Sequence, residues 1–523
     1  MQLASTVLCL LVFLLFSAAT ARADDRPNIV YIFSDDHAIQ AIGAYGHPLT
    51  KLAPTPNLDR IAAEGAIFLN SFCTNSICAP SRAVVLTGVH SHLNGKRDNS
   101  TEPFDGSQPT FPKLLQQAGY RTAFFGKWHL RSEPTGFDEW EVLPGQGNYY
   151  NPDYLTAEGR HRETGYVDDL STAKAVEFLG KNVNGEGPFL LWLGFKSPHR
   201  SWQPGPKELD LYRGVQFPEP PTLFDDYAGR SPAAANQEMT IAGHMNPPID
   251  LKLTPPLATT DDKSLPGLYR RMNDEQRRQW DAAYADENAD YLSRRDDMTE
   301  AERTRWRYQR YVGDYLRCIA GVDRNVGDVL DALDRLGLAE NTIVVYSSDQ
   351  GFYLGEHGWY DKRWMYEESL RMPLLMRWPS RIEAGTRVEA MVQNLDHAPS
   401  LLSAAKIEVP ERMQGKSLHP LIDDQTVEWR DAIYYHYFEF PAVHSVRKHY
   451  GVRTNRYKLI RFYGDDDGFE AWELFDLERD PREMKSVYDN EGYGEIQGVL
   501  KAKLRDLRRQ YGDSEGPAMG SED

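Results

Sequence analysis

The residues best suited to chemistry stand in short polar clusters that are far apart in the sequence. Cys78 opens the run Cys78-Ala79-Pro80-Ser81-Arg82, which leads into an apolar helical stretch ending at Leu86-Thr87-Gly88. The pairs Asp35-Asp36 and Asp349-Gln350 each follow an apolar, strand-like run. Carboxylate and amide oxygens without imidazole suit a hard cation such as Ca²⁺ or Mg²⁺. The two pairs together therefore predict a metal site.

Each of these clusters also has a purely structural explanation. Asp35-Asp36 fits a helix N-cap pair, and the residues from Ser348 to Gly351 fit a turn. Cys78 fits a half-buried free thiol beside a helix start. The choice between the two explanations depends on whether the chain also supplies cations for an anionic substrate.

Cationic side chains occur at comparable places. Arg82 lies four residues after Cys78 and so shares its helical face. Lys127 and His129 flank Trp128 after another strand-like run, His199 follows Ser197-Pro198, and Lys362 lies in the segment 361–367. A single lysine or histidine in such a place is more often a surface or core residue than a catalyst. Their number and order favour an anion-binding site.

Taken together, the cysteine motif, the two acidic pairs and the order Gly-Lys-x-His, Pro-His and Lys-x-x-x-Tyr-Glu resemble the formylglycine-dependent (type I) sulfatases. The resemblance runs from Asn28 to the tail. It implies that a maturation enzyme oxidises Cys78 to formylglycine. It also implies one divalent ion, Ca²⁺ or Mg²⁺, held by Asp35, Asp36, Cys78, Asp349 and Gln350. Many relatives carry Asn or His where this chain has Gln350.

The same resemblance assigns catalytic roles. It implies Cys78, Arg82, Lys127, His129, His199 and Lys362 as the catalytic residues. The aldehyde hydrate would attack sulfur in line, while Lys127, His199 and Lys362 hold the sulfuryl oxygens and assist the departing alcohol. His129 would then take a proton from the second hydroxyl, so that sulfate is eliminated and the aldehyde is restored.

The substrate is indicated by two further segments. Residues 349–358 and 434–451 resemble exported bacterial carbohydrate sulfatases such as the N-acetylglucosamine-6-sulfatases, which implies a sulfated carbohydrate as the substrate. His357, His444 and Arg447 are the implied substrate-binding residues, and Glu439 and His449 lie in the same tail region. Trp202, Trp359 and Tyr435 fit sugar stacking and the core equally well.

Two other functions remain open at this point. One is a phosphodiester or phosphonate hydrolase of the same superfamily, which would share the sheet and the metal site. The other is a non-catalytic glycan-binding relative, in which Cys78 stays unmodified. The single set of oxygen donors favours sulfate over phosphate.

The periodicity predicts an α/β protein. Buried strands are expected at 27–33, 121–125, 189–195 and 342–346, with helices at 56–63, 111–118, 168–179 and 298–336. Polar clusters follow the strands, at the sheet edge where such folds bind ligands. The resemblance adds an alkaline-phosphatase-like architecture, a large mixed sheet flanked by helices. Residues 204–265, rich in Pro, are expected to form a surface excursion near the site.

The tail differs from the rest of the chain. Short strands are expected at 433–438, 450–454, 457–462 and 473–476, followed by a helix at 495–511. This pattern predicts a smaller β-rich α+β subdomain. We expect a catalytic domain at 24–425 and a C-terminal subdomain at 426–523 that contributes to the substrate pocket.

Composition and the N-terminus limit the cellular setting. The chain has 523 residues and a net charge of −18, which argues against nucleic acid or an anionic membrane as a partner. An apolar run at 7–19 and the small-x-small pattern Ala21-Arg22-Ala23 predict a signal peptide at 1–23. We therefore expect an exported protein, periplasmic or secreted, with no stable membrane insertion after cleavage.

The cysteines predict no disulfide framework. Three remain in the expected mature chain, Cys73, Cys78 and Cys318. A bridge between Cys73 and Cys78 is the competing hypothesis, and it would disable the nucleophile. The odd count and the motif favour an unpaired Cys78.

Overall fold

A ten-stranded sheet forms the centre of the computed structural model, which describes residues 26–517 and 519 except 101, 184, 186, 254–266, 268 and 466. The strand order is β13-β2-β12-β9-β1-β8-β4-β5-β6-β7. The strands are β1 Asn28–Ser34, β2 Ala66–Phe68, β4 Arg121–Lys127, β5 Glu139–Leu143, β6 Asp153–Thr156, β7 Gly159–Arg162, β8 Phe189–Gly194, β9 Thr342–Ser348, β12 Leu374–Arg377 and β13 Thr386–Val388. The central strands β9, β1, β8, β4 and β5 are parallel, whereas β12, β6 and β7 run antiparallel to their neighbours. The predicted large mixed sheet is confirmed.

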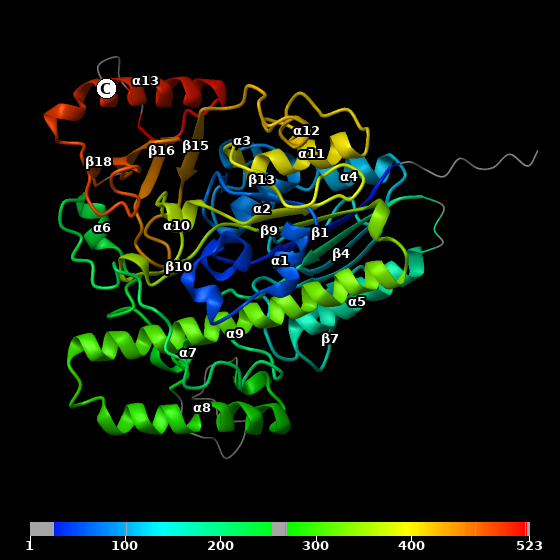
Figure 1. Ribbon diagram of the computed structural model, residues 1–523, viewed down its shortest axis with the longest axis horizontal. Helices are drawn as coiled ribbons and strands as arrows, with labels where there is room; N and C mark the ends of the chain where they lie inside the picture. Colours follow the sequence, from blue (N-terminus) through cyan, green and yellow to red (C-terminus); the bar gives the residue numbers. More distant parts are fainter. Residues whose placement is uncertain are drawn as a thin grey trace, which may run out of the picture.

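Helices cover both faces of this sheet (Figure 1). The central strand shows why, because Tyr31 and Phe33 belong to one apolar cluster while Val30 and Ile32 belong to another. Alternate side chains of a strand point to opposite faces, so a strand that is apolar throughout needs cover on both. The first face packs against α2 Cys78–Thr87, α4 Phe111–Gln117 and α11 His397–Ala404, and the second against α1 Pro56–Ala63, α5 Val167–Asn182 and α9 Glu300–Arg335.

Helix α9 is the longest element of the predicted set, and it carries more than the expected apolar stripe. Val322, Val326 and Val329 are buried against the sheet as predicted. Asp323 is buried as well, and its Oδ1 accepts hydrogen bonds from the backbone N–H groups of Asn57 and Leu58 at 3.0 and 2.8 Å. Backbone N–H groups in the first turn of a helix have no partner within that helix, so Asp323 of α9 caps α1.

The C-terminal residues form the predicted second unit. Strands β15 Ala432–Tyr437, β16 Lys448–Thr454, β17 Tyr457–Tyr463 and β18 Glu470–Asp476 make an antiparallel sheet, and α13 Gly494–Gln510 lies over it (Figure 1). Leu500 and Leu504 of α13 pack on this sheet. The domain boundary at 425/426 itself stays a prediction.

The excursion after β8 differs from the expectation for residues 204–265. Its described part, up to residue 253, contains α6 Pro232–Asn236 and α7 Pro247–Asp250 and buries Leu223, Met239 and Ile241. It therefore packs into the core rather than lying only on the surface. Helix α8, Asp274–Arg294, was not predicted, because its apolar positions are few and its charged residues lie all round it.

Short elements complete the described part of the chain. Strand β3 Ser71–Phe72 pairs with β14 Val392–Gln393, and β10 Tyr353–Leu354 pairs with β11 Tyr360–Asp361. The short helices are α3 Ser91–Asn94, α10 Glu367–Leu370 and α12 His419–Asp423, with 3₁₀ turns that include η1 Ile39–Ala41 and η4 Tyr269–Arg271.

The predicted signal peptide at 1–23 lies outside the described residues. Within them, the helices are too short or too polar for any to span a bilayer. Cys73, Cys78 and Cys318 are all free and buried, so the bridge between Cys73 and Cys78 is absent and the prediction of an unpaired Cys78 is confirmed.

The packing of α13 on the C-terminal sheet can be tested by substitution. Leu504 is completely buried among the side chains of the C-terminal sheet, whereas Val499 on the same helix is 59% exposed. We expect Leu504→Ala to lower the free energy of unfolding by about 2–5 kcal/mol, because it leaves a cavity. Val499→Ala is the matched control, expected within about 0.5 kcal/mol of the unaltered protein. Chemical denaturation measures both, and equal stabilities of the two variants would contradict this packing.

Candidate active site

Cys78 is the first residue of α2 and is fully buried. Pro80 is compatible with this place because the first turn of a helix does not need its N–H. Ser81 ties the start of α2 to the end of β9, since its hydroxyl donates to the carbonyl of Asp349 and accepts from Asn394 Nδ2. The motif is thereby held against the sheet edge at which β1 and β9 end.

Three carboxylates surround the cysteine. Asp35 and Asp36 follow β1, Asp349 follows β9, and the parallel register that pairs Ser34 with Ser348 places these ends side by side. Ligand atoms of Asp35, Asp36, Cys78 and Asp349 all lie within 4.8 Å of one another. The Sγ atom of Cys78 is 3.9 Å from Asp36 Oδ1. The structure thus brings together the predicted metal ligands.

Gln350 adds an amide oxygen to the predicted metal ligands. Its amide nitrogen donates to Asp36 Oδ1, while its Oε1 is buried and has no hydrogen-bond partner among the described residues. A buried oxygen without a partner is costly unless something binds it. Three carboxylates and an amide oxygen fit a hard divalent cation, so the donor set agrees with the predicted metal site.

Burial disfavours the charged form of each of the three aspartates. It raises the pKa of Asp349 to about 8, with the neighbouring Asp35 adding to the effect, and it raises the pKa of Asp36 to about 6 although Lys362 opposes it. Burial acts in the same sense on Asp35, but the charges of Lys127 and Arg82 outweigh it and hold that pKa well below its usual value. A bound cation would add positive charge at the site and so reduce the repulsion between the three carboxylates.

The loop that carries Asp36 is fixed from outside the sheet. Asp36 has a left-handed backbone with φ of 68°. The hydroxyl of Tyr315, on α9, donates to the Asp36 carbonyl at 2.7 Å and accepts from the backbone N–H of Ala38 at 2.8 Å. Tyr315 appeared in the sequence only as a core position of a helix, because helical spacing does not reveal where a hydroxyl ends.

Arg82 bridges two of the carboxylates. Its guanidinium donates to Asp349 Oδ2 at 3.1 and 3.2 Å and to Asp35 Oδ1 at 3.4 Å, and also to the carbonyl of Lys127 at 2.9 Å. Arg82 is therefore placed in the predicted cluster, where it orders the carboxylates and the end of β4.

Lys127 ends β4 and lies in the same cluster. Its ammonium donates to Asp35 Oδ2 and to Gln146 Oε1. Gln146 belongs to the loop after β5 and was missed by the sequence analysis, because nothing in that loop resembles a motif. Lys196, also buried, donates to the Gln146 carbonyl at 3.0 Å and so holds the loop in place.

Lys362 approaches from the other side. Its ammonium lies 2.5 and 2.6 Å from the two carboxylate oxygens of Asp36. His199 Nε2 is 3.9 Å from Asp36 Oδ2, and its Nδ1 is 2.5 Å from the Arg200 carbonyl, which fixes the ring. Both lysines and His199 therefore face the carboxylates, and the sulfate-binding role predicted for them stays a prediction.

The two histidines are held neutral. Burial, followed by the charge of Lys127, lowers the pKa of both His129 and His199 well below the usual value. His129 Nδ1 is buried without a hydrogen-bond partner among the described residues. A neutral imidazole with an unpartnered nitrogen is equipped to accept a proton.

The three predicted substrate-binding residues are dispersed. His444 Nε2 lies 2.9 Å from Asp361 Oδ2. Asp361 precedes Lys362 in the chain and also accepts a hydrogen bond from Arg363, so it connects His444 to the cluster. Arg447 pairs with Asp467 and stacks on Phe440. His357 is buried, and its Nδ1 lies 2.9 Å from both Asp225 and Arg230 rather than near the cluster.

The aromatic candidates are core residues. Trp202, Trp359 and Tyr435 are each fully buried. Stacking on a sugar ring needs an exposed face, so the alternative in which these residues belong to the core is the correct one. Tyr435 acts locally, since its hydroxyl donates to the Arg363 carbonyl at 2.6 Å.

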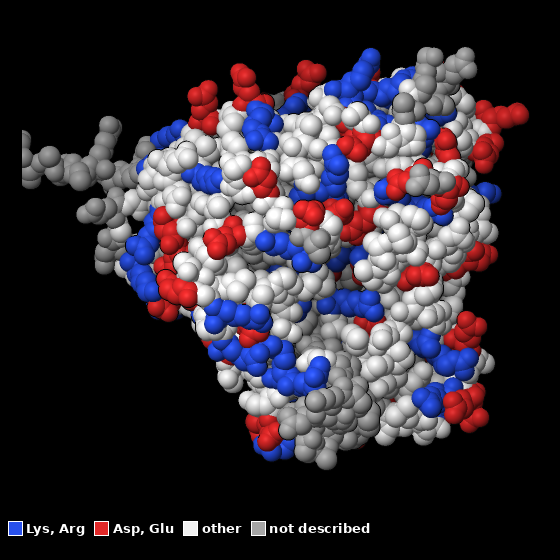
Figure 2. Space-filling model, turned by 180° about the vertical axis from the view of Figure 1, so that it is seen from behind, with Lys and Arg blue, Asp and Glu red and all other residues white. Residues whose placement is uncertain are grey.

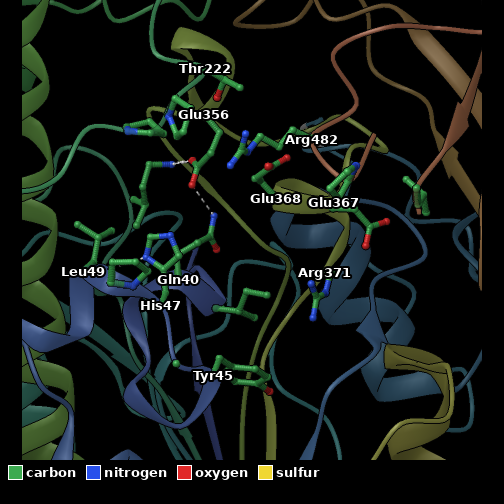
Figure 3. Close-up of a pocket in the computed structure, with 18 of the residues that line it drawn as sticks. Gln40, Tyr45, His47, Leu49, Thr222, Glu356, Glu367, Glu368, Arg371 and Arg482 are labelled. Carbon is green, nitrogen blue, oxygen red and sulfur yellow. Dashed lines mark hydrogen bonds between the residues drawn. The ribbon is translucent and has the colours of Figure 1, made fainter. Parts of the chain in front are cut away.

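A cavity of about 830 Å³ lies apart from this cluster, at the junction of the two sheets. Figure 3 shows Glu356, Glu368 and Arg482 directed into it, with Gln40 bonded to Glu356. The cluster of Cys78, the three aspartates and the two lysines does not line this cavity. Its members are buried.

Comparison with known proteins agrees with this geometry. A family model described as Sulfatase matches residues 27–407, and one described as N-sulphoglucosamine sulphohydrolase, C-terminal, matches residues 355–510. The chain belongs to the sulfatase family. It is thus an enzyme of this family.

Individual relatives refine the comparison. The chain is 46% identical to an N-acetylglucosamine-6-O-sulfatase of Bacteroides thetaiotaomicron over 499 residues, covering 94% of this chain and 88% of that one. A solved structure of a protein in complex with its substrate D-glucosamine-2-N,6-O-disulfate is also 46% identical, with a TM-score of 0.90 and 94% and 99% coverage. A phosphonate monoester hydrolase from Silicibacter pomeroyi has a TM-score of 0.71 at 17% identity, with 95% and 98% coverage, which shows the fold alone.

The donor set predicts stabilisation by a divalent ion. We expect Ca²⁺ at about 100 times its Kd to stabilise the unaltered protein by about 2.7 kcal/mol, seen as a rise in Tm. Asp349→Asn should lose that rise, whereas Asp296→Asn, in an exposed turn, should keep it. A thermal melt of the chelator-treated protein with and without Ca²⁺ measures this, and equal Ca²⁺ shifts in both variants would contradict the site.

The contact of Gln146 with Lys127 predicts a positioning role. We expect Gln146→Ala to lower kcat/KM for sulfate release by about tenfold, because the ammonium of Lys127 loses one of its two anchors. Asn148→Ala, in the same loop, is the control, and Tm should be unchanged in both. Steady-state kinetics decide the matter, and an unchanged kcat/KM for Gln146→Ala would exclude the role.

Proposed function

We propose that this chain hydrolyses sulfate esters of carbohydrates, with the 6-O-sulfate of glucosamine units as its substrate. The observation that carries the proposal is the cysteine at the start of α2 among three carboxylates, with Lys127 and Lys362 on either side. The relatives named above, one an N-acetylglucosamine-6-O-sulfatase and one bound to a 6-O-sulfated glucosamine, support the choice of substrate.

The nucleophile is proposed to be formylglycine, made from Cys78 by a maturation enzyme. Burial raises the pKa of the Cys78 thiol well above its usual value, although Lys362 opposes this, so the unmodified thiol is a poor nucleophile. The hydrated aldehyde would supply a hydroxyl for attack on sulfur. Asp35, Asp36, Asp349 and Gln350 would hold Ca²⁺, which supplies positive charge that activates such a hydroxyl.

The two lysines are proposed to bind the sulfate group. An ammonium has three N–H donors. Lys127 uses two of them on Asp35 and Gln146, and Lys362 binds the two oxygens of Asp36. Each therefore keeps a donor for a sulfuryl oxygen, and their charges oppose the negative charge that develops as the ester bond breaks.

The histidines are proposed to move protons. His129 is proposed to accept a proton from the nucleophile, a role supported by its neutral state and its unpartnered Nδ1. Because His199 Nδ1 donates to the Arg200 carbonyl, its Nε2 presents a lone pair to the site while the ring is neutral. In that state the ammonium of Lys362 is the stronger partner for the departing oxygen.

Recognition of the sugar is proposed for the network beside Lys362. Arg363 is buried and bonds Asp361, which in turn bonds His444. Among the described residues, Arg363 Nε has no hydrogen-bond partner, so it offers a donor for a sugar hydroxyl next to the group that holds the sulfate. The roles predicted for Arg447 and His357 remain predictions, as does export to the periplasm or beyond.

Replacement of Cys78 provides the test. Protein co-produced with a maturation enzyme should release sulfate from glucosamine 6-O-sulfate, and Cys78→Ala should release none, because no aldehyde can form. Ion chromatography measures the sulfate, and mass spectrometry confirms the residue at position 78. Sulfate release by Cys78→Ala would refute the mechanism. Cleavage of a phosphodiester assayed in parallel, without sulfate release from glucosamine 6-O-sulfate, would favour the phosphoester alternative.

A further inference from the structure

The hairpin of β6 and β7 at the edge of the large sheet carries an unusual charge arrangement. Asp153 pairs with Arg162, and Leu155 pairs with Arg160 across the antiparallel strands. Since side chains alternate along a strand, Asp153, Arg160 and Arg162 share one face, and His161 points to the other.

Three guanidinium groups converge on the single carboxylate of that face. Arg162 Nε is 2.7 Å and Arg271 Nη2 is 3.1 Å from Asp153 Oδ1, and Arg160 bonds Oδ2. Among the described residues, one carboxylate neutralises one of the three cations, so two positive charges remain unpaired there. The side chains of Arg160 and Arg162 are 59% and 60% exposed, so this surplus faces solvent.

The opposite face of the hairpin shows no such surplus among its described contacts. There Lys174 contacts both Glu141 and Glu163, which also contact His161. Figure 2 shows Lys and Arg side chains gathered low on this face of the molecule with few acidic groups among them. In a chain with a net charge of −18, a local excess of this kind needs a reason.

The arginine-bearing face of the hairpin lies at the carboxyl ends of β4 and β5, where the catalytic cluster also lies. Strands β4 and β5 are parallel and end there, at Lys127 and Leu143. The loop after β5 passes through Gln146, which contacts Lys127, and enters β6 at Asp153. In the order β4-β5-β6-β7 the arginines lie three strand spacings from Lys127. At about 4.8 Å per spacing this is about 14 Å.

We propose that Arg160, Arg162 and Arg271 form a second anion-binding subsite, which holds a sulfate or carboxylate farther along a glycan chain whose 6-O-sulfate occupies the catalytic cluster. The inference rests on the proposed function. Guanidinium groups match the planar spacing of sulfate and carboxylate oxygens and keep their charge at any physiological pH. The subsite also attracts a polyanion toward a protein of like net charge.

A binding measurement tests the proposed subsite independently of catalysis. In a Cys78→Ala background, calorimetry with a heparin-derived tetrasaccharide should show about tenfold weaker binding when Arg160→Ala and Arg162→Ala are added. The dependence of Kd on salt should also become shallower, because exposed charges are screened. The control adds Arg278→Ala and Arg294→Ala instead, two exposed arginines that each pair with a carboxylate on α8.

Kinetics with two substrates complete the test. In the catalytically intact protein, Arg160→Ala with Arg162→Ala should raise KM for the tetrasaccharide about tenfold and leave hydrolysis of glucosamine 6-O-sulfate unchanged. Equal tetrasaccharide affinity in the double variant and the control would overturn the subsite. Equal losses on both substrates would overturn it too, since the arginines would then act through the fold. If the intact protein released no sulfate, the proposed function would fail while the binding result still decided the subsite.

Discussion

The structure depends on one electrostatic constraint, which is that three carboxylates must lie together inside the protein. Asp35, Asp36 and Asp349 are completely buried at the ends of two neighbouring strands. Arg82 bridges two of them and Lys362 neutralises the third. Removing one partner of a buried ion pair typically costs about 3–5 kcal/mol, so these cations hold the site together before any substrate arrives.

The same constraint explains how the neighbouring elements are used. The cluster draws side chains from the end of β4, from the loop after β8 and from the segment after β11, because several cations must converge on a small volume. Tyr315 and Ser81 fix the backbone at either end of the cluster, through the carbonyls of Asp36 and Asp349. The polar groups of the site form a connected hydrogen-bond network, apart from Gln350 Oε1 and His129 Nδ1, which have no partner among the described residues.

Charge is also organised over a longer range. Arg82, Lys127 and Lys362 are buried and paired with carboxylates, so in the proposed mechanism they meet a sulfate only when it enters the site. The arginines of the β6–β7 hairpin are exposed and, in the part of the chain that the structure describes, share the single carboxylate of Asp153. A buried cation contributes binding and catalysis, whereas an exposed one contributes attraction at a distance that salt weakens. Both kinds lie along one edge of the same sheet.

The sequence by itself determined the elements with strong local patterns and the residues that belong to motifs. The run of apolar residues in β1, the stripe on α9 and the cysteine motif each carry their signal in neighbouring positions. Helix α8 and the packing of the excursion escaped prediction because their burial depends on distant partners. Only the tertiary structure decided that Gln146 contacts Lys127, that Trp202 and Trp359 are core, and that His357 lies away from the site. Such contacts join residues far apart in the chain, and no local pattern encodes them.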